Sequence, residues 1–259
     1  MHKATIAAFI LFAAAGILIA QEKEATKSLS RSLSAGLTMT DGNSDTLQGN
    51  LSLKIEGEKE RLGSVLAGLE ANYGESAPGT KTNTAANGES STDNSKEKTV
   101  DNARAYANAK KTITPMTFGY LDGSALYDDM AKIDYRVTAG PGLGAYIFKS
   151  DLRALSVEAG PSYVLEKVQS ATDDFVALRT AERFTCAIGK SSKIWQSAEC
   201  LFKTDDFGDY FLTAEAGAEA AMTEILSLRL VLQCRYDSTP GEGLVKRDTT
   251  LIAGLTVSL

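Results

Sequence analysis

The residues that could carry out chemistry in this chain are few, and their types are restrictive. The one histidine is His2, at the extreme start, and the three cysteines are Cys186, Cys200 and Cys234. A serine or cysteine nucleophile needs a positioned base, most often an imidazole, and catalytic zinc sites are commonly built on histidine. A single terminal histidine therefore argues against triad-type hydrolases and against histidine-based metal sites.

Paired carboxylates are the remaining candidates for acid–base or metal chemistry. Adjacent acidic residues occur at Asp128 and Asp129, at Asp173 and Asp174, and at Asp205 and Asp206. Such pairs could share a proton or supply oxygen ligands to calcium. All three fall in expected loops or at their edges, so we interpret them as solvated loop charge, with a divalent-ion contact as the alternative. We predict no catalytic residue, no metal site and no cofactor.

Each cysteine lies in an expected strand beside apolar neighbours, such as Phe184 and Ile188 around Cys186. We interpret the three cysteines as small apolar side chains that face lipid. The alternative is a disulfide formed in an oxidising compartment, for which the spacing provides no framework.

The first twenty residues have the composition of a secretory signal peptide. A basic start at residues 1–3 precedes an apolar run from Ala4 to Ala20, and polar residues follow directly. The apolar core is shorter than the roughly 20 residues that a transmembrane helix needs. We predict cleavage after Ala20, a short linker over residues 21–27 and one domain over residues 28–259. The alternative is a retained helical anchor. Cleavage would remove the only histidine.

The composition excludes further classes of protein. Acidic residues outnumber basic ones, 33 to 27, and the net charge is −6. A nucleic-acid-binding domain usually has a basic excess, which this chain lacks. No stretch after residue 20 approaches 18 consecutive apolar residues, so we predict no spanning helix in the mature protein.

Apolar and polar residues alternate along most of the chain. In residues 28–40, for example, Leu33, Leu37 and Met39 occupy odd positions, and every even position is serine, glycine or threonine. A period of two predicts β-strands, because successive side chains leave a strand on opposite faces. The whole chain gives twelve expected strands: 28–40, 45–57, 61–74, 99–111, 115–128, 133–147, 152–166, 175–188, 192–203, 210–221, 224–237 and 248–259.

The lengths of these strands and of their connections favour a membrane barrel. Strands in soluble domains usually have about 5–6 residues, whereas a tilted strand needs about 9–11 to cross a bilayer. Short turns alternate with longer polar loops along the chain, which is typical of outer-membrane barrels. We predict an all-β fold, an antiparallel transmembrane β-barrel of about 12 strands. The longest connection, residues 75–98, has no apolar run, so we expect it to be an unordered, exposed loop.

The face opposite the apolar rows carries charges of both signs, among them Lys54, Glu70, Arg104, Arg179, Arg229 and Arg235. Charged side chains inside a barrel lose hydration free energy unless they form ion pairs or remain hydrated. They therefore either interlock as a plug or line a pore, and the similar numbers of both signs favour a plug. We predict an ion pair between Arg136 and either Asp128 or Glu158, with Gly140, Gly142 and Gly144 leaving room for the arginine side chain.

Several short motifs occur in order along the chain: Asp41-Gly42-Asn43 after the first strand, Asp134-Tyr135-Arg136 before Gly140, Gly142 and Gly144, then Glu158 with Gly160-Pro161, and finally Lys246-Arg247-Asp248. Together they resemble the salt-induced outer-membrane protein family, domain of unknown function 481, over most of residues 28–259. The resemblance implies a barrel in the outer membrane of a Gram-negative-type cell. Its implied partners are outer-membrane lipid, lipopolysaccharide and the barrel-insertion machinery. It implies no reaction.

The sequence thus favours a non-enzymatic outer-membrane β-barrel with a structural or stress-related role, either plugged or forming a narrow pore. Two alternatives remain open. One is a barrel that binds a partner at the cell surface through the 75–98 loop. The other is a soluble periplasmic barrel holding an apolar ligand, in which the leucine rows would line a cavity.

Overall fold

The computed structural model describes residues 30–40, 44–59, 63–78, 81–84, 90–93, 97–189 and 191–259. Three predicted features lie outside the described residues: the signal peptide (residues 1–20), the linker (residues 21–27) and the Asp41-Gly42-Asn43 motif. Among the described residues, no helix is long and apolar enough to span a membrane.

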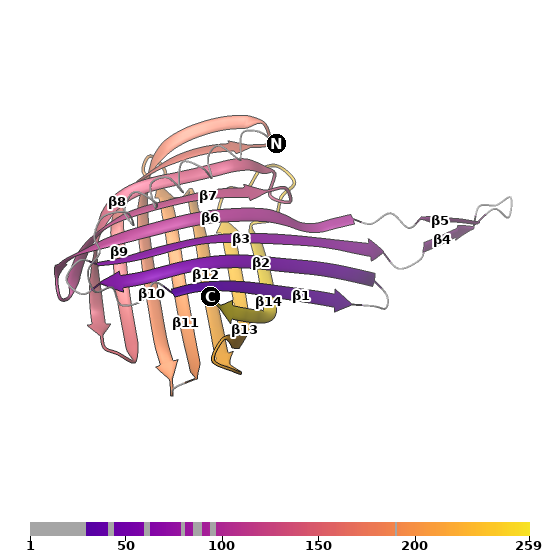
Figure 1. The fold of residues 1–259 in the computed structure, drawn as a ribbon. Coiled ribbons are helices and arrows are strands. Elements are labelled where there is room, and N and C mark those ends of the chain that lie inside the picture. Colours follow the sequence, from indigo (N-terminus) through magenta and orange to yellow (C-terminus); the bar gives the residue numbers. More distant parts are fainter. Residues whose placement is uncertain are drawn as a thin grey trace.

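Strands make up most of the described chain. Their bounds are β1 Ser30–Thr40, β2 Ser44–Lys59, β3 Gly63–Pro78, β4 Lys81–Thr84, β5 Ser90–Asp93, β6 Glu97–Thr114, β7 Thr117–Asp128, β8 Ile133–Lys149, β9 Arg153–Val168, β10 Ala171–Ile188, β11 Ser192–Lys203, β12 Tyr210–Ala221, β13 Leu226–Asp237 and β14 Arg247–Ser258. Twelve of them form one closed antiparallel barrel in the order β1-β14-β13-β12-β11-β10-β9-β8-β7-β6-β3-β2 (Figure 1). The predicted fold and its twelve barrel strands are confirmed.

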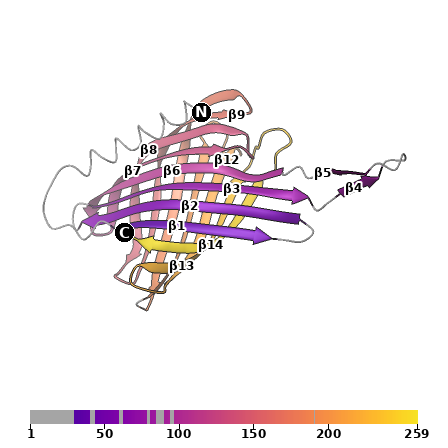
Figure 2. The ribbon, with the colours of Figure 1, turned by 45° about the vertical axis from the view of Figure 1, so that its right-hand side comes forward.

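The expectation of an unordered loop over residues 75–98 is wrong in two respects. β3 continues to Pro78, and β4 pairs with β5 as a separate two-stranded sheet, which projects beyond the barrel between β3 and β6 (Figures 1 and 2). A hairpin satisfies its backbone hydrogen bonds locally, and threonine favours extended backbone. The absence of apolar residues therefore did not prevent strand formation.

The expected polar loop at residues 167–174 is also replaced by strand. β9 and β10 extend until only Gln169 and Ser170 connect them, and the two residues have φ angles of 48° and 72°. Positive φ at both central residues is the geometry of a tight type I′ turn, which matches the twist of the flanking strands. Asp173 and Asp174 consequently lie on β10 rather than in a loop.

The two faces of the barrel wall have opposite character. Apolar side chains point outward and are exposed, including Leu51 at 53% and Leu251 at 59%. Polar side chains point inward and are buried, including Ser34 at 5% and Thr256 at 4%. A soluble barrel around an apolar ligand would have the reverse arrangement, so that alternative is wrong. An apolar exterior around a polar interior is the pattern of outer-membrane barrels.

One seam joins the first and last strands of the barrel, β1 and β14. The ladder between β1 and β14 runs from Ser32 opposite Ser258 to Gly36 opposite Gly254, whereas the ladder between β1 and β2 covers β1 from Ser30 to Thr40. Inside the seam the Ser34 and Thr256 hydroxyls lie 2.8 Å apart and share a hydrogen bond. The barrel therefore closes through a ladder that is shorter than its neighbour.

Candidate functional site

The lumen of the barrel holds the candidate site, and its centre is a buried guanidinium. Arg179 on β10 lies 2.7 Å from Glu199 on β11, 2.9 Å from Glu158 on β9 and 3.3 Å from Asp122 on β7. Lys110 on β6 adds a second cation to this group, 2.6 Å from Glu158. The Arg179 side chain is only 7% exposed. Charge-assisted hydrogen bonds from one guanidinium to several carboxylates fix these strands relative to one another.

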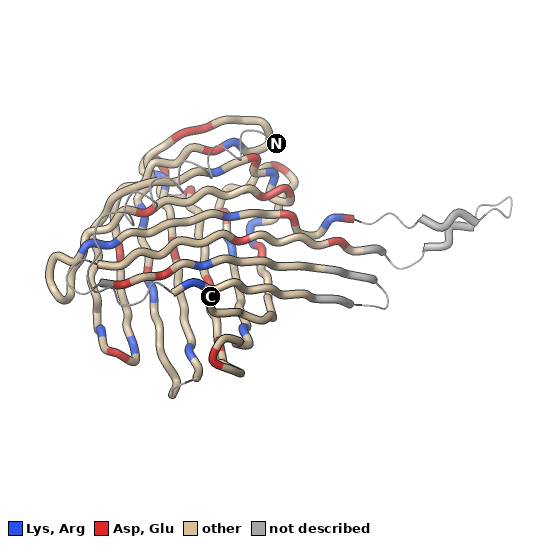
Figure 3. Tube along the Cα trace, in the orientation of Figure 1, with Lys and Arg blue, Asp and Glu red and all other residues tan. Residues whose placement is uncertain are grey.

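Other ion pairs cross the lumen. Arg235 on β13 donates from Nη1 to Asp128 Oδ2 on β7 at 3.1 Å, and these strands are six places apart in the ring of twelve. Arg104 Nη2 on β6 lies 4.0 Å from Glu199 Oε1 on β11, five places away. Acidic and basic residues are spread along the barrel strands (Figure 3). The opposite walls are thus linked by charged side chains.

The predicted pairing of Arg136 with Asp128 or Glu158 is wrong, although all three residues form ion pairs in the lumen. Arg136 Nε donates to Glu166 Oε2 at 2.5 Å, because these residues are directly opposite in the β8–β9 register. The guanidinium also covers the Phe211 ring, 3.6 Å from its centroid. Glu158 is opposite Gly144 instead, too far along the strands to reach Arg136.

The glycines of β8 have a role different from the one predicted. A Cβ atom at Gly142 would lie 2.3 Å from the Tyr120 ring, and one at Gly144 would lie 2.4 Å from the Phe118 ring. Both aromatic residues are on β7 and are buried in the lumen wall. These glycines therefore accommodate aromatic rings rather than the Arg136 side chain. Gly140 and Gly160 permit the backbones of β8 and β9 to approach closely, since their Cβ atoms would meet the carbonyls of Pro161 and Pro141.

A second polar group lines the wall near the seam. Trp195 Nε1 donates to Glu215 at 2.6 Å, and Gln233 donates to the same carboxylate at 3.0 Å. Arg229 Nη1 donates to Ser52 Oγ at 3.1 Å, and the guanidinium lies 5.5 Å from the centre of the Trp195 ring. Hydroxyl and amide groups therefore share the stabilisation of these charges.

Some residues that form hydrogen bonds in the lumen are uncharged, and they were not identified from the sequence because only the charged residues of the lumen were considered. Asn50 donates to Asn72 at 2.7 Å, and Asn72 donates to Asn102 at 2.8 Å, so an amide ladder crosses β2, β3 and β6. The recurrence of asparagine at inward positions of three neighbouring strands is the sequence pattern that could have predicted this ladder. Such a ladder satisfies buried amides without adding charge.

The predicted acidic pairs do not form paired sites. Asp128 points into the lumen, whereas Asp129 contacts Lys98 at 3.0 Å at the rim. Asp173 contacts Lys203, and Asp174 accepts a hydrogen bond from Tyr163. Within the part of the chain that the structure describes, no group of three or more His, Cys, Asp or Glu side chains could hold a metal ion.

The rim contact shifts the pKa values of its members. Hydrogen bonding to the Lys98 ammonium holds the pKa of Asp129 below its usual value. In turn, Asp101 and then Asp129 raise the pKa of Lys98 above its usual value. Both groups lie beyond the exposed Tyr73, at the end of the barrel where β4 and β5 project.

The three cysteines are free, and they lie on the outward face of the wall. Cys186 shares its face with the exposed Ile188, and Cys234 shares its face with the exposed Leu232. The prediction that they are small apolar side chains facing lipid is confirmed.

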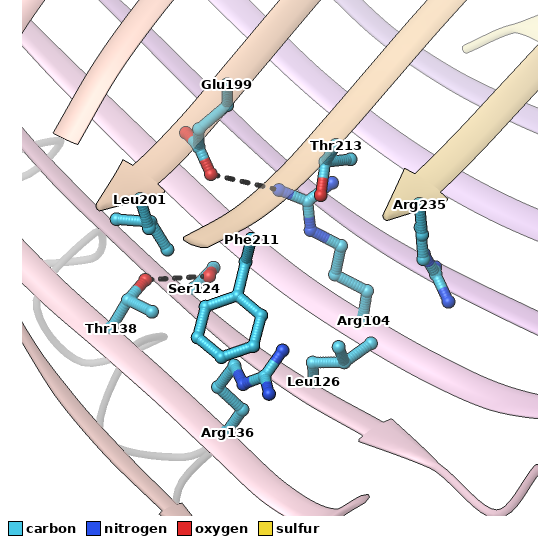
Figure 4. A pocket seen from close by; sticks show the side chains of 10 residues that line it. All are labelled: Arg104, Ser124, Leu126, Arg136, Thr138, Glu199, Leu201, Phe211, Thr213 and Arg235. Atoms are coloured by element: carbon cyan, nitrogen blue, oxygen red, sulfur yellow. Dashed lines mark hydrogen bonds and ion pairs between the residues drawn. The ribbon is translucent and has the colours of Figure 1, made fainter. Parts of the chain in front are cut away.

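A small cavity lies in the lumen next to the crossing ion pairs. This cavity of about 50 Å³ lies between them (Figure 4). Its wall includes Arg104, Arg136, Arg235, Glu199 and Phe211. A hydrated solute of appreciable size does not fit this space.

A closed barrel with an apolar exterior and a polar, charged lumen defines an outer-membrane β-barrel protein. The family model described as "Protein of unknown function, DUF481" matches residues 33–259, and the chain belongs to this family. The resemblance to domain of unknown function 481, inferred from the short motifs, is thereby confirmed. A search of curated proteins finds no match.

Solved structures show a similar architecture at low sequence identity. The NanC porin is 8% identical, with a TM-score of 0.51, and the match covers 89% of this chain and 100% of that chain. The translocator domain of the autotransporter NalP from Neisseria meningitidis is 11% identical, with a TM-score of 0.47, covering 98% of this chain and 97% of that one. OmpT, an outer-membrane protein of Vibrio cholerae, is 8% identical, with a TM-score of 0.42, covering 91% and 99%.

Proposed function

We propose that the protein is a non-enzymatic structural barrel of the outer membrane of a Gram-negative-type cell, with a lumen closed by its own ion pairs. The observation that carries this proposal is the Arg235–Asp128 pair, 3.1 Å long, between strands on opposite sides of the ring. In this proposal, lipopolysaccharide and lipid surround the apolar exterior, and the barrel-insertion machinery assembles it.

The contents of the lumen favour a plug over an open pore. Arg179 contacts three carboxylates, so removing it from the path would break several charge-assisted bonds at once. The cavity of about 50 Å³ beside the crossing ion pairs has room for only a few water molecules. The NanC porin shares the fold, but a barrel of this type conducts only when its interior is water-filled.

The arrangement of chemical groups supports a role without catalysis. No histidine occurs in the described residues, and the adjacent aspartates point to separate partners. Asp122, Glu158 and Glu199 are held by Arg179, which leaves these carboxylates poorly suited to accept a proton from a substrate.

Conductance in a planar bilayer tests the proposal. The wild-type protein is expected to give no open-channel steps, whereas Asp128→Ala combined with Arg235→Ala is expected to conduct. Removing both partners avoids leaving one uncompensated buried charge. Asp134→Ala with Lys167→Ala, which removes an exposed ion pair of 2.5 Å at a strand end, is the matched control and should stay closed. Porin-like conductance of the wild type would contradict the plug.

A further inference from the structure

We propose that the lumen contains a binding site for a small oxyanion, of phosphate or carboxylate size, formed by Arg104, Arg136 and Arg235. The site goes beyond the structural role proposed above, because a closed barrel needs no ligand. It is also independent of whether the barrel conducts.

Three guanidinium groups from well-separated strands line one cavity. Arg104 comes from β6, Arg136 from β8 and Arg235 from β13 (Figure 4). Hydroxyl groups complete the polar part of the wall: Ser124, Thr138 and Thr213. Arginine carries five N–H donors in a planar fork that matches carboxylate and phosphate oxygens, and hydroxyls can donate as well. The cavity wall is therefore rich in donors for an anion.

Arg104 has the weakest internal partner of the three arginines. Glu199 accepts hydrogen bonds from Arg179 at 2.9 Å and forms an ion pair with it at 2.7 Å, but lies 4.0 Å from Arg104. A separation of 4.0 Å exceeds the normal length of an N–H···O bond. Glu70 is opposite Arg104 in the β3–β6 register and adds negative charge nearby. Arg104 thus presents hydrogen-bond donors to the cavity.

The other two arginines each form an ion pair and retain further N–H donors. Arg235 donates to Asp128 through Nη1, and Arg136 donates to Glu166 through Nε. Arg136 also lies 3.7 Å from Asp237 through Nη2. These bonds hold the two side chains in place while leaving further N–H groups on each guanidinium. A preorganised arginine loses little freedom when it binds an anion.

Positively charged side chains outnumber negatively charged ones among the residues that line the cavity, which favours an anion over a cation as the ligand. Three arginines line the cavity, and Glu199 is the carboxylate among the lining residues. Arg179 lies 2.7 Å from that carboxylate. Asp128, Glu166 and Asp237, which pair with Arg235 and Arg136, are not among the lining residues. A ligand in the cavity therefore meets guanidinium groups first.

The size of the cavity fits a small oxyanion. A cavity needs about 10–15 Å³ to hold one water molecule, so a volume of about 50 Å³ has room for roughly three to five. Carboxylate ions such as acetate have four non-hydrogen atoms, and inorganic phosphate has five. A sugar or nucleotide is too large.

The test measures the stability of the folded barrel in detergent as a function of inorganic phosphate, with sodium chloride at matched ionic strength as the reference. A ligand that binds only the folded state raises the urea midpoint as its concentration rises. We expect the midpoint of the wild type to rise with phosphate, and that of Arg104→Gln to become independent of it. Arg183→Gln, a lumen-facing and exposed arginine outside this cavity, should respond like the wild type.

A second variant keeps the test decisive if Arg104→Gln does not fold. Thr213 lies opposite Arg235 in the β12–β13 register and lines the cavity, so Thr213→Glu places a fixed carboxylate where the anion would bind. Its midpoint without phosphate should exceed that of the wild type, and phosphate should no longer raise it. The proposal is overturned if phosphate leaves the wild type unchanged, or if either cavity variant responds as the wild type does.

Discussion

Arg235 and Asp128 meet at 3.1 Å from strands that stand opposite each other in the barrel. Strands about 4.8 Å apart and tilted by about 40° would give a circular barrel of twelve strands a diameter of roughly 24 Å. An arginine and an aspartate side chain together reach only about half that distance. The two walls must therefore approach each other at this level, and the cross-section of the barrel is narrower there than that of a cylinder.

Removing the central cation is expected to be strongly destabilising. Arg179→Ala would leave Asp122, Glu158 and Glu199 without their shared partner, and breaking a buried charge cluster in this way costs about 3–5 kcal/mol. Urea unfolding in lipid vesicles measures the loss. Arg183→Ala, on the same strand and face but exposed, is the control and should change stability little. Equal losses for the two variants would refute the central role of Arg179.

A charge placed on the outer face should be much more costly than one placed in the lumen. Leu232 is exposed in the middle of β13, on the apolar face, so Leu232→Arg should destabilise the barrel by about 2–4 kcal/mol. Thr185→Arg, at an exposed lumen position of β10, should be tolerated. Reversed folding yields of these variants in vesicles would show that the faces are assigned the wrong way round.

Glu182 presents a carboxylate on the lipid-facing side of β10, which it shares with the exposed Val176 and Ile188. It accepts a hydrogen bond from Gln196 on β11 at 2.8 Å. A charged side chain at this face is unfavourable, so Glu182→Leu should preserve or raise the urea midpoint. Glu199→Leu, which removes a lumen carboxylate, should lower it. A marked loss of stability in Glu182→Leu would mean that its face is not in contact with lipid.

The rim contact between Lys98 and Asp129 makes a prediction about pH. A lowered pKa of Asp129 and a raised pKa of Lys98 mean that the contact is complete between the two unfolded values, which are about 3.9 and 10.4. Its contribution is lost only as the pH falls through the lowered Asp129 pKa or rises through the raised Lys98 pKa. NMR titration of the Asp129 carboxyl should give a pKa below its usual value, and Lys98→Gln should return it toward that value. A normal pKa in the wild type would exclude the contact.

Deleting residues 79–96 should leave the barrel intact. The β3–β6 ladder pairs Ser76 with Glu97, so a short linker can join the strands, and the free energy of closing a loop changes slowly with its length. The deletion variant should still show a compact band that shifts on boiling in a gel of the membrane fraction. If a surface partner binds through this segment, its binding disappears while the band persists. Loss of the folded band would show that the segment stabilises the barrel.

The strands could be predicted from sequence because one face of each contacts an apolar medium and the other a polar lumen. That contrast produces the alternation of apolar and polar residues, as at Leu33, Ser34 and Leu37, which can be recognised within a single segment of sequence. The hairpin of β4 and β5 has no such contrast, since its strands are stabilised by backbone pairing, and it was missed. Gln169 and Ser170 lack the glycine or asparagine that usually marks a type I′ turn, so this turn was missed too.

The ion-pair partners could be predicted only in part. Inward-facing positions follow from alternation, which placed Arg136, Glu158 and Arg179 in the lumen. The choice of partner depends on the register between strands and on the approach of distant walls, and neither is encoded within one segment. Arg136 therefore pairs with Glu166 across one ladder, and Asp128 pairs with Arg235 across the lumen.

The short seam between β1 and β14 has a consequence for the order of assembly. Within the described barrel, the other ladders join strands that follow one another along the chain, with the β4–β5 hairpin inserted between β3 and β6. Those ladders can form hairpin by hairpin as the chain enters the bilayer, because each closes only a local loop. The seam instead brings together residues more than two hundred positions apart, such as Ser34 and Thr256, so its formation is entropically the most demanding and comes last. Because the same ladder is short, we expect a folded barrel to open there first.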